Sequence, residues 1–201
     1  MRAIIITLLC IAVFAVKKEE FLDKPILAET NSEAELAQTG TYVGEYMIIA
    51  VNSGRVLDIS GGSTRNGAGL IQEHSHGGNN QRFEVWKVGK SNVMNRDYFV
   101  IRAKHSGKVL TASGRDLTQI IQSDYQPNND YQIWTWEPEG VLYVWVKNKG
   151  SDRCMAVKGD SLNDGAPVIQ DYKRDKYWQD NYQLWYFLEV VYNKSLDNFP
   201  F

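Results

Sequence analysis

Three tripeptides of the sequence share one pattern, a glutamine followed two positions later by an aromatic residue: Gln81-Arg82-Phe83, Gln132-Ile133-Trp134 and Gln183-Leu184-Trp185. They follow one another at equal intervals of 51 residues. An isoleucine and a glutamine precede each tripeptide: Ile71-Gln72, Ile121-Gln122 and Ile169-Gln170. Further upstream, an apolar pair follows a turn signal in each copy: Val56-Leu57, Val109-Leu110 and Cys154-Met155. Features that recur in the same order indicate three copies of one structural unit.

Within each copy the apolar segments are short, rich in β-branched and aromatic residues, and bounded by Gly, Asn, Asp and Ser, which is typical of strands. In the first copy they cover about residues 46–51, 55–59, 69–73 and 82–88. The three copies therefore predict twelve strands. Because one repeat cannot bury its own apolar face, the copies must close around a common core. Alternation along the strands predicts twelve inward residues: Ile48, Leu57, Ile71, Phe83, Ile101, Leu110, Ile121, Trp134, Val146, Met155, Ile169 and Trp185.

The repeated Gln-x-Trp pattern resembles that of the ricin-B-type lectin family, whose fold is the β-trefoil. The resemblance covers about residues 42–191, and Phe83 replaces the tryptophan of the first copy. It implies an all-β β-trefoil of three four-stranded repeats. Each motif glutamine is expected to hydrogen-bond the backbone between strands, and each aromatic residue to fill the core. The motifs therefore indicate the fold, and a sugar site has to be argued separately.

The N-terminus has the pattern of a secretory signal peptide. Arg2 precedes an apolar run, residues 3–16, which is shorter than the roughly 20 apolar residues that a membrane span needs. We expect cleavage after Ala15. We expect the protein to be secreted or extracellular, or to be stored in a secretory granule, and we expect no membrane span. An uncleaved anchor or a buried helix is the alternative.

The rest of the chain divides by composition. Residues 16–41 carry Lys, Glu and Ala without period-2 alternation, which favours a linker or propeptide, and a short docked helix over residues 33–37 is the competing interpretation. Residues 42–191 form the predicted β-trefoil domain, and residues 192–201 form a tail. Once the signal peptide is removed, Cys154 is the only cysteine, so no intrachain disulfide can form.

Composition and charge argue against several functions. The net charge of -2, with no long run of Lys or Arg, lacks the electrostatic footprint of a nucleic-acid-binding protein. The histidines are His74, His76 and His105, and they complete no recognisable catalytic set, so neither an enzyme nor a cofactor is expected. His74 and His76 lack a third metal ligand at a recognisable spacing. Asp58 and Glu73 supply the two carboxylates of a glycosidase by number only.

The first copy carries the residue types that recognise a sugar. A hydroxyl-rich ring is bound by a carboxylate, by amides and by a flat side chain against its apolar face. The family resemblance implies Asp after the Val-Leu pair, an aromatic residue after Ile-Gln and Asn before the motif glutamine; this copy has Asp58, His74 and Asn80 there. The predicted carbohydrate-binding residues are Asp58, Gln72, His74, Asn80 and Gln81. Because Leu57 faces the core, alternation predicts that the Asp58 carboxylate points outward into solvent.

The other two copies lack this combination. At the Asp, platform and Asn positions, the second copy has Thr111, Asp124 and Tyr131, and the third has Ala156, Tyr172 and Tyr182. Neither copy keeps the carboxylate acceptor. The longer loop of the third copy, residues 173–181, contains Tyr177 and Trp178, which either build a different aromatic site or cover the barrel mouth.

The sequence thus predicts a secreted, non-catalytic module that binds a galactose-type or related glycan through one site in the first repeat. The type of sugar is implied by the family resemblance. The expected partners are glycans or glycoproteins. The competing interpretation is a structural or protein-interaction β-trefoil, such as a matrix or secretory-granule component, and an enzyme of unknown chemistry comes third.

Overall fold

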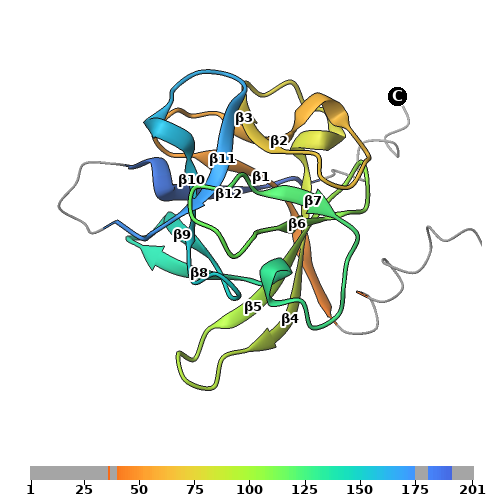
Figure 1. Cartoon of the computed structure of the whole chain (residues 1–201), viewed down its shortest axis with the longest axis vertical. Helices are drawn as coiled ribbons and strands as arrows, with labels where there is room; N and C mark the ends of the chain where they lie inside the picture. Colours follow the sequence, from red (N-terminus) through yellow and green to blue (C-terminus); the bar gives the residue numbers. More distant parts are fainter. Residues whose placement is uncertain (1–35, 37–39, 175–180, 192–201) are drawn as a thin grey trace, which may run out of the picture. The chain divides into compact units, whose positions relative to one another are not determined.

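The computed structural model describes Leu36 and residues 40–174 and 181–191, and the predicted signal peptide and C-terminal tail lie outside these residues. The described regular structure is dominated by twelve strands (Figure 1). They are β1 (Thr41–Ala50), β2 (Val56–Ile59), β3 (Leu70–Glu73), β4 (Phe83–Lys90), β5 (Asp97–Ala103), β6 (Val109–Thr111), β7 (Ile121–Ser123), β8 (Trp134–Glu139), β9 (Tyr143–Asn148), β10 (Cys154–Val157), β11 (Ala166–Asp171) and β12 (Leu184–Glu189). Five short 3-10 helices connect them: η1 (Ser60–Gly62), η2 (Asn79–Gln81), η3 (Asp130–Gln132), η4 (Lys158–Asp160) and η5 (Asn181–Gln183). The all-β class and the twelve strands are confirmed.

Six strands close into an antiparallel barrel. β1 pairs with β4 and β12, and the ring continues through β4–β5, β5–β8, β8–β9 and β9–β12. The other six strands form the hairpins β2–β3, β6–β7 and β10–β11, one from each repeat. A closed barrel leaves no strand edge unpaired. A six-stranded barrel with three hairpins is the arrangement of a β-trefoil, with four strands from each repeat.

The aromatic residues of the three motifs lie at the centre of the fold. Phe83 and Trp134 are the first residues of β4 and β8, and Trp185 is the second residue of β12. All three are fully buried. The Trp134 indole donates to the Leu110 carbonyl at 3.1 Å, and the Trp185 indole donates to the Met155 carbonyl at 3.0 Å. These bonds join the barrel to the β6–β7 and β10–β11 hairpins, so the motif residues fill the core at the hairpin end of the barrel.

The predicted inward residues of the third strand in the first two repeats are wrong by one position. Ile71 and Ile121 are only half-buried, whereas Leu70 and Ile120 are fully buried. Gln72 and Gln122, two positions further on, are fully buried as well. Residues two apart on a strand share a face. Leu70 and Ile120 therefore lie on the same buried face as Gln72 and Gln122, and Ile71 and Ile121 lie on the other face.

These glutamines form a ring of hydrogen bonds between the repeats. The Gln72 amide donates to the carbonyls of Ser161 and Asn163 in the third repeat, at 2.8 and 2.9 Å. The equivalent Gln122 donates to the first repeat and Gln170 to the second: the acceptors are the carbonyls of Ser63 and Arg65, and of Ser113 and Arg115. A buried amide of each repeat therefore donates to two loop carbonyls of a neighbouring repeat and links the two repeats.

The segment before β1 contacts the barrel through one described residue. Leu36 is helical and fully buried, and it packs with Val100, Val109 and Ile133. Its carbonyl accepts a hydrogen bond from the Gly40 amide at 2.7 Å. The remainder of the helix predicted over residues 33–37 lies outside the described residues. Among the described residues, no helix is long and apolar enough to cross a membrane.

Candidate functional site

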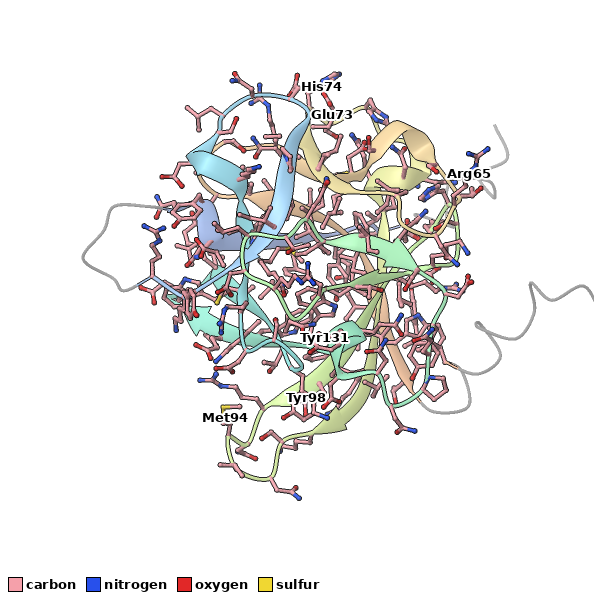
Figure 2. All side chains as sticks on the ribbon, in the orientation of Figure 1. Arg65, Glu73, His74, Met94, Tyr98 and Tyr131 are labelled. Atoms are coloured by element: carbon pink, nitrogen blue, oxygen red, sulfur yellow. The ribbon has the colours of Figure 1, made fainter. Side chains whose placement is uncertain are left out.

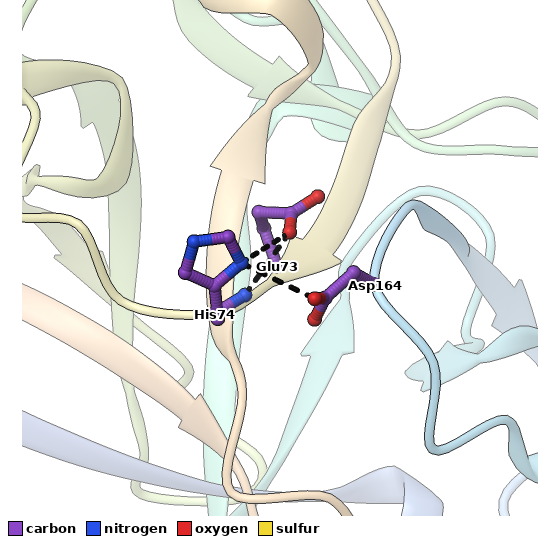
Figure 3. Close-up of side chains that lie close together, drawn as sticks. All are labelled: Glu73, His74 and Asp164. Atoms are coloured by element: carbon purple, nitrogen blue, oxygen red, sulfur yellow. Dashed lines mark hydrogen bonds and ion pairs between the residues drawn. The ribbon is translucent and has the colours of Figure 1, made fainter.

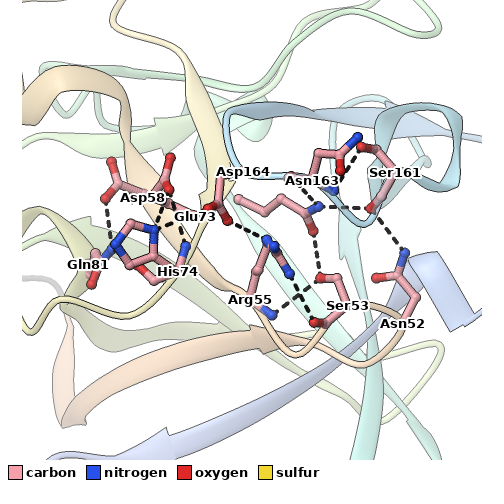
Figure 4. A network of polar contacts seen from close by, with 11 residues as sticks. Asn52, Ser53, Arg55, Asp58, Glu73, His74, Gln81, Ser161, Asn163 and Asp164 are labelled. Carbon is pink, nitrogen blue, oxygen red and sulfur yellow. Dashed lines mark hydrogen bonds and ion pairs between the residues drawn. The ribbon is translucent and has the colours of Figure 1, made fainter.

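The first repeat gathers three side-chain donors around one carboxylate oxygen. Asp58 lies on β2, and its Oδ2 accepts from the Asn80 amide at 2.9 Å and from the Gln81 amide at 3.0 Å. The Nε2 atom of His76 is 3.2 Å from the same oxygen. Figure 4 shows the contact between Asp58 and Gln81. The structure thus brings Asp58, Asn80 and Gln81 together, and it adds His76 to them.

Asp58 is only 3% exposed, so the expectation of a carboxylate pointing outward into solvent is wrong. The physical reason is that β2 is buried along its whole length, since the chain after β3, with η2, folds over its outer face. A buried charge requires donors, and the three donors supply them. Because all three bond Oδ2, Oδ1 is left without a protein donor among the described residues.

His76 was not among the predicted binding residues. Its backbone N–H donates to Gln81 Oε1 at 2.9 Å, and its Nδ1 accepts from the Gly78 N–H at 3.2 Å. Nδ1 is therefore unprotonated, and the ring offers its Nε2–H to Asp58. A Cβ atom on Gly78 would lie 2.7 Å from the His76 ring and 2.6 Å from Asn80, so a larger residue there would displace these two side chains. The sequence signal for His76 was its place two residues after His74.

His74 lies beside this group but is bonded elsewhere. Its side chain is 68% exposed, and its Nδ1 is 2.8 Å from Glu73 and 3.2 Å from Asp164 of the third repeat (Figure 3). Glu73 and His74 project from the surface in Figure 2. The His74 and His76 rings are 6.2 Å apart. The ring predicted to stack on a sugar is thus part of a contact between two repeats.

The acidic neighbours of His74 change its protonation. Hydrogen bonds to Asp164 and then to Glu73 raise the pKa of the His74 imidazole above its ordinary value, against a small opposing effect of desolvation. Arg55 also binds Asp164. For Asp164, partial burial acts to raise the pKa, but the bonds from Arg55 and His74 lower it below its usual range. Protonated His74 and ionised Asp164 therefore stabilise one another.

We expect His74→Gln to destabilise the protein at acidic pH and to have little effect at alkaline pH. A histidine whose folded pKa is raised contributes stability that is complete below its unfolded pKa of about 6.5 and is lost as the pH rises through the folded pKa. Thermal unfolding of parent and variant across this range measures the difference. In an Asp164→Asn background, His74→Gln should lose most of this pH dependence. A melting-temperature difference that is the same at all pH values would contradict the contact.

Glu73, His74 and Asp164 also bring three potential metal-ligand atoms within 4.8 Å of one another. His76, the second histidine considered for a metal site, is not part of this group and contacts Asp58 instead. The same Asp164 carboxylate already holds the Arg55 guanidinium, and a cation placed there would meet a positive charge. The arrangement is that of an ion-pair network between the first and third repeats.

Gln72, the fifth predicted binding residue, lies apart from the group around Asp58. Its amide is fully buried and bonded to the third repeat, and its carbonyl oxygen accepts from the Ser53 hydroxyl at 2.8 Å. Figure 4 shows this inter-repeat network beside Asp58. Since its donors and acceptor are occupied, Gln72 holds the fold and is not positioned for a ligand.

The corresponding positions of the other repeats lack a carboxylate. Thr111 takes the place of Asp58 in the second repeat, and its hydroxyl accepts from the Gln132 amide at 3.2 Å. Ala156 takes that place in the third repeat and is fully buried. Tyr172, the platform residue there, is covered by the Arg153 guanidinium at 3.6 Å from the ring centre. The alternative aromatic pair, Tyr177 and Trp178, lies outside the described residues.

A family model described as a ricin-type beta-trefoil lectin domain-like family matches residues 35–95 and 84–171. The chain belongs to this family. The predicted family is therefore confirmed, and more than half of the chain is matched. A search of curated proteins finds no match. The matched residues include the first two glutamine motifs, and the third, Gln183-Leu184-Trp185, follows them.

Solved structures share the fold of this ricin-type domain. A designed threefold-symmetric protein, ThreeFoil, is 30% identical with a TM-score of 0.66, over 74% of this chain and 100% of that one. An exo-β-1,3-galactanase from Clostridium thermocellum is 24% identical with a TM-score of 0.64, over 74% of this chain but 30% of the enzyme. The C-terminal half of an earthworm R-type lectin, solved with GalNAc, is 19% identical with a TM-score of 0.53, over 74% of this chain and 100% of that one.

Proposed function

We propose that the protein is a non-catalytic carbohydrate-binding module that binds a galactose-type glycan through one site in the first repeat. The observation that carries this proposal is the Asp58 carboxylate, held through Oδ2 by three donors and left with Oδ1 for a ligand. The similarity to an earthworm lectin solved with GalNAc supports the choice of sugar. In this proposal His76 and Asn80 flank the ligand, and Gln72 is not a ligand contact.

The competing function is a structural or protein-interaction β-trefoil. It is favoured by His74, whose ring is engaged with two carboxylates instead of being free to stack on a sugar. A galactose-type ligand would then have only the half-exposed His76 ring against its apolar face, and an imidazole is smaller than the ring of Trp, Tyr or Phe. The two functions differ in one measurable property, direct binding of a free glycan.

Screening the mature chain on an array of galactose- and GalNAc-terminated glycans tests the proposal. We expect binding to a subset of these glycans that free GalNAc inhibits, and weak monovalent affinity because one site is present. Isothermal titration of the same GalNAc into an Asp58→Ala variant should give no heat of binding. A chain that binds no glycan on the array would support the structural role and overturn the lectin proposal.

We further propose that the protein is secreted after cleavage behind Ala15. The supporting observation is the basic residue followed by a short apolar run and Ala15. N-terminal sequencing of material from the producing cells tests this, and the expected first residue is Val16. Recovery of the chain from the cytosol with Met1 intact would reverse the proposal.

A further inference from the structure

The interior of the barrel is arranged in two tiers of six side chains. The tier next to the hairpins consists of Ile48, Phe83, Ile101, Trp134, Val146 and Trp185, all fully buried. A second tier lies two residues away on each strand, toward the end of the barrel opposite the hairpins. It consists of Tyr46, Val85, Phe99, Trp136, Val144 and Phe187. Residues two apart on a strand share a face, so both tiers point into the barrel.

The second tier departs from the threefold symmetry of the repeats. The pairing of the barrel strands makes Val85, Trp136 and Phe187 equivalent, because they lie opposite Ile101, Val146 and Ile48. By the same pairings, Val144 is equivalent to Tyr46 and Phe99. Valine therefore stands at two of six positions where the other repeats carry aromatic rings.

A cavity of about 200 Å³ occupies the space that the two valines leave. Five residues of the second tier line it, all except Phe99, and Val43 and Leu142 form its rim. The Phe187 ring lies 4.9 Å from the Trp136 ring and 5.8 Å from the Tyr46 ring. The cavity opens to solvent between the exposed side chains of Val43 and Leu142, and an open, aromatic-walled hollow is a feature of binding sites.

Polar groups at this end of the barrel limit what the cavity can hold. Glu189 lies directly opposite Tyr46 in the strand register, and its side chain is exposed at the end of β12. Burial, and then the charge of the Glu189 carboxylate, raise the pKa of the Tyr46 hydroxyl. Lys87, equivalent to Glu189, is paired with Asp97 at 2.8 Å. Glu189 does not line the cavity, but next to Tyr46 its carboxylate is the acceptor for a ligand whose donor or positive charge extends beyond the apolar walls.

We propose that the open end of the barrel binds a small aromatic ligand carrying an amino or hydroxyl group, with its ring against Phe187, Val85 and Val144 and its donor toward Glu189. The size follows from the volume, since an apolar cavity of about 150 Å³ holds one benzene ring. The aromatic walls favour a flat apolar group over a flexible chain. This proposal is independent of the proposed glycan site, because Asp58 lies on the hairpin β2–β3 and not in the barrel.

Saturation-transfer NMR with 2-phenylethylamine tests the proposal on the full chain. We expect transfer from the protein to the ring protons of the amine, and clearly weaker binding of the similarly sized anion 3-phenylpropanoate. Val144→Phe should abolish the transfer, because it restores the aromatic ring that the equivalent positions carry. Its folding is checked by the far-UV spectrum.

Two surface variants keep the test decisive if Val144→Phe does not fold. Leu142 is 60% exposed on the cavity rim, and Val141, its neighbour in the same turn, is 98% exposed and not part of the lining. Leu142→Ser should weaken binding of the amine about tenfold by removing apolar contact, while Val141→Ser should leave it unchanged. No transfer to the parent protein, equal binding in parent and Leu142→Ser, or equal binding of amine and carboxylate would overturn the proposal.

Discussion

Trp134→Ala is expected to lower the free energy of unfolding by about 3–5 kcal/mol, the usual range for emptying a core aromatic position. Trp134 is fully buried in the tier next to the hairpins, and its indole donates to the Leu110 carbonyl. The variant loses the ring contacts and also leaves that buried carbonyl without its donor. Equilibrium unfolding in urea, followed by circular dichroism, measures the change.

Trp145→Ala is the matched control. Trp145 is half-buried on the outer face of β9, where the Lys173 ammonium lies 3.9 Å from the ring centre. Its removal costs a surface cation–π contact and some apolar burial, and we expect a loss below about 1.5 kcal/mol. Equal losses in the two variants would show that the motif tryptophan is not a central packing element.

The fold was predictable because its determinants are local and occur three times. The Gln-x-aromatic motif fixes which residue of β4, β8 and β12 enters the core, and Phe83, Trp134 and Trp185 are all buried as predicted. The third strand was less predictable, since Ile71 and Ile121 each follow another apolar residue, so that either register looks equally apolar. The buried glutamine decided between them, and its hydrogen bonds to another repeat are not visible in the sequence.

The candidate site was predicted only as far as short-range patterns reach. Asp58, Asn80 and Gln81 meet because β2 and η2 belong to one repeat. The contact of His74 with Asp164 joins the first and third repeats, 90 residues apart, and no local pattern signals it. The burial of Asp58 has a similar cause: alternation describes a strand alone and cannot foresee that a later loop will cover its outer face.

Asp58→Ala is expected to weaken binding of a galactose-type glycan by about 2–4 kcal/mol, roughly 30- to 700-fold. This range corresponds to two ligand hydroxyls that both donate to Oδ1, at ~1.5–3 kcal/mol each, less what solvent returns. Because a single site binds weakly, a loss of this size removes measurable binding. Titration calorimetry with the glycan identified on the array measures it.

The same substitution should also destabilise the protein, in contrast to the unchanged melting temperature that an outward carboxylate implies. Asp58 is buried, and its removal leaves the donors of Asn80, Gln81 and His76 without their shared acceptor. Unsatisfied donors near the surface regain part of the lost energy from water, so we expect about 2–4 kcal/mol. Thr111→Ala removes the uncharged acceptor at the equivalent position of the second repeat. It should lower the free energy of unfolding by less than Asp58→Ala does and leave glycan binding unchanged.

Loss of binding in Asp58→Ala has to be separated from loss of stability, because a loosened loop would also weaken a site. Ile120→Ala provides the comparison: Ile120 is fully buried in the second repeat, and its truncation should destabilise by about 2–5 kcal/mol without contacting Asp58. Measured well below both melting temperatures, Ile120→Ala should bind the glycan as the parent does, and Asp58→Ala should not. If Asp58→Ala retains the parent's affinity, the ligand does not use this carboxylate. A glycan site elsewhere would have to bind without a carboxylate at this position, since the second and third repeats carry Thr111 and Ala156 there.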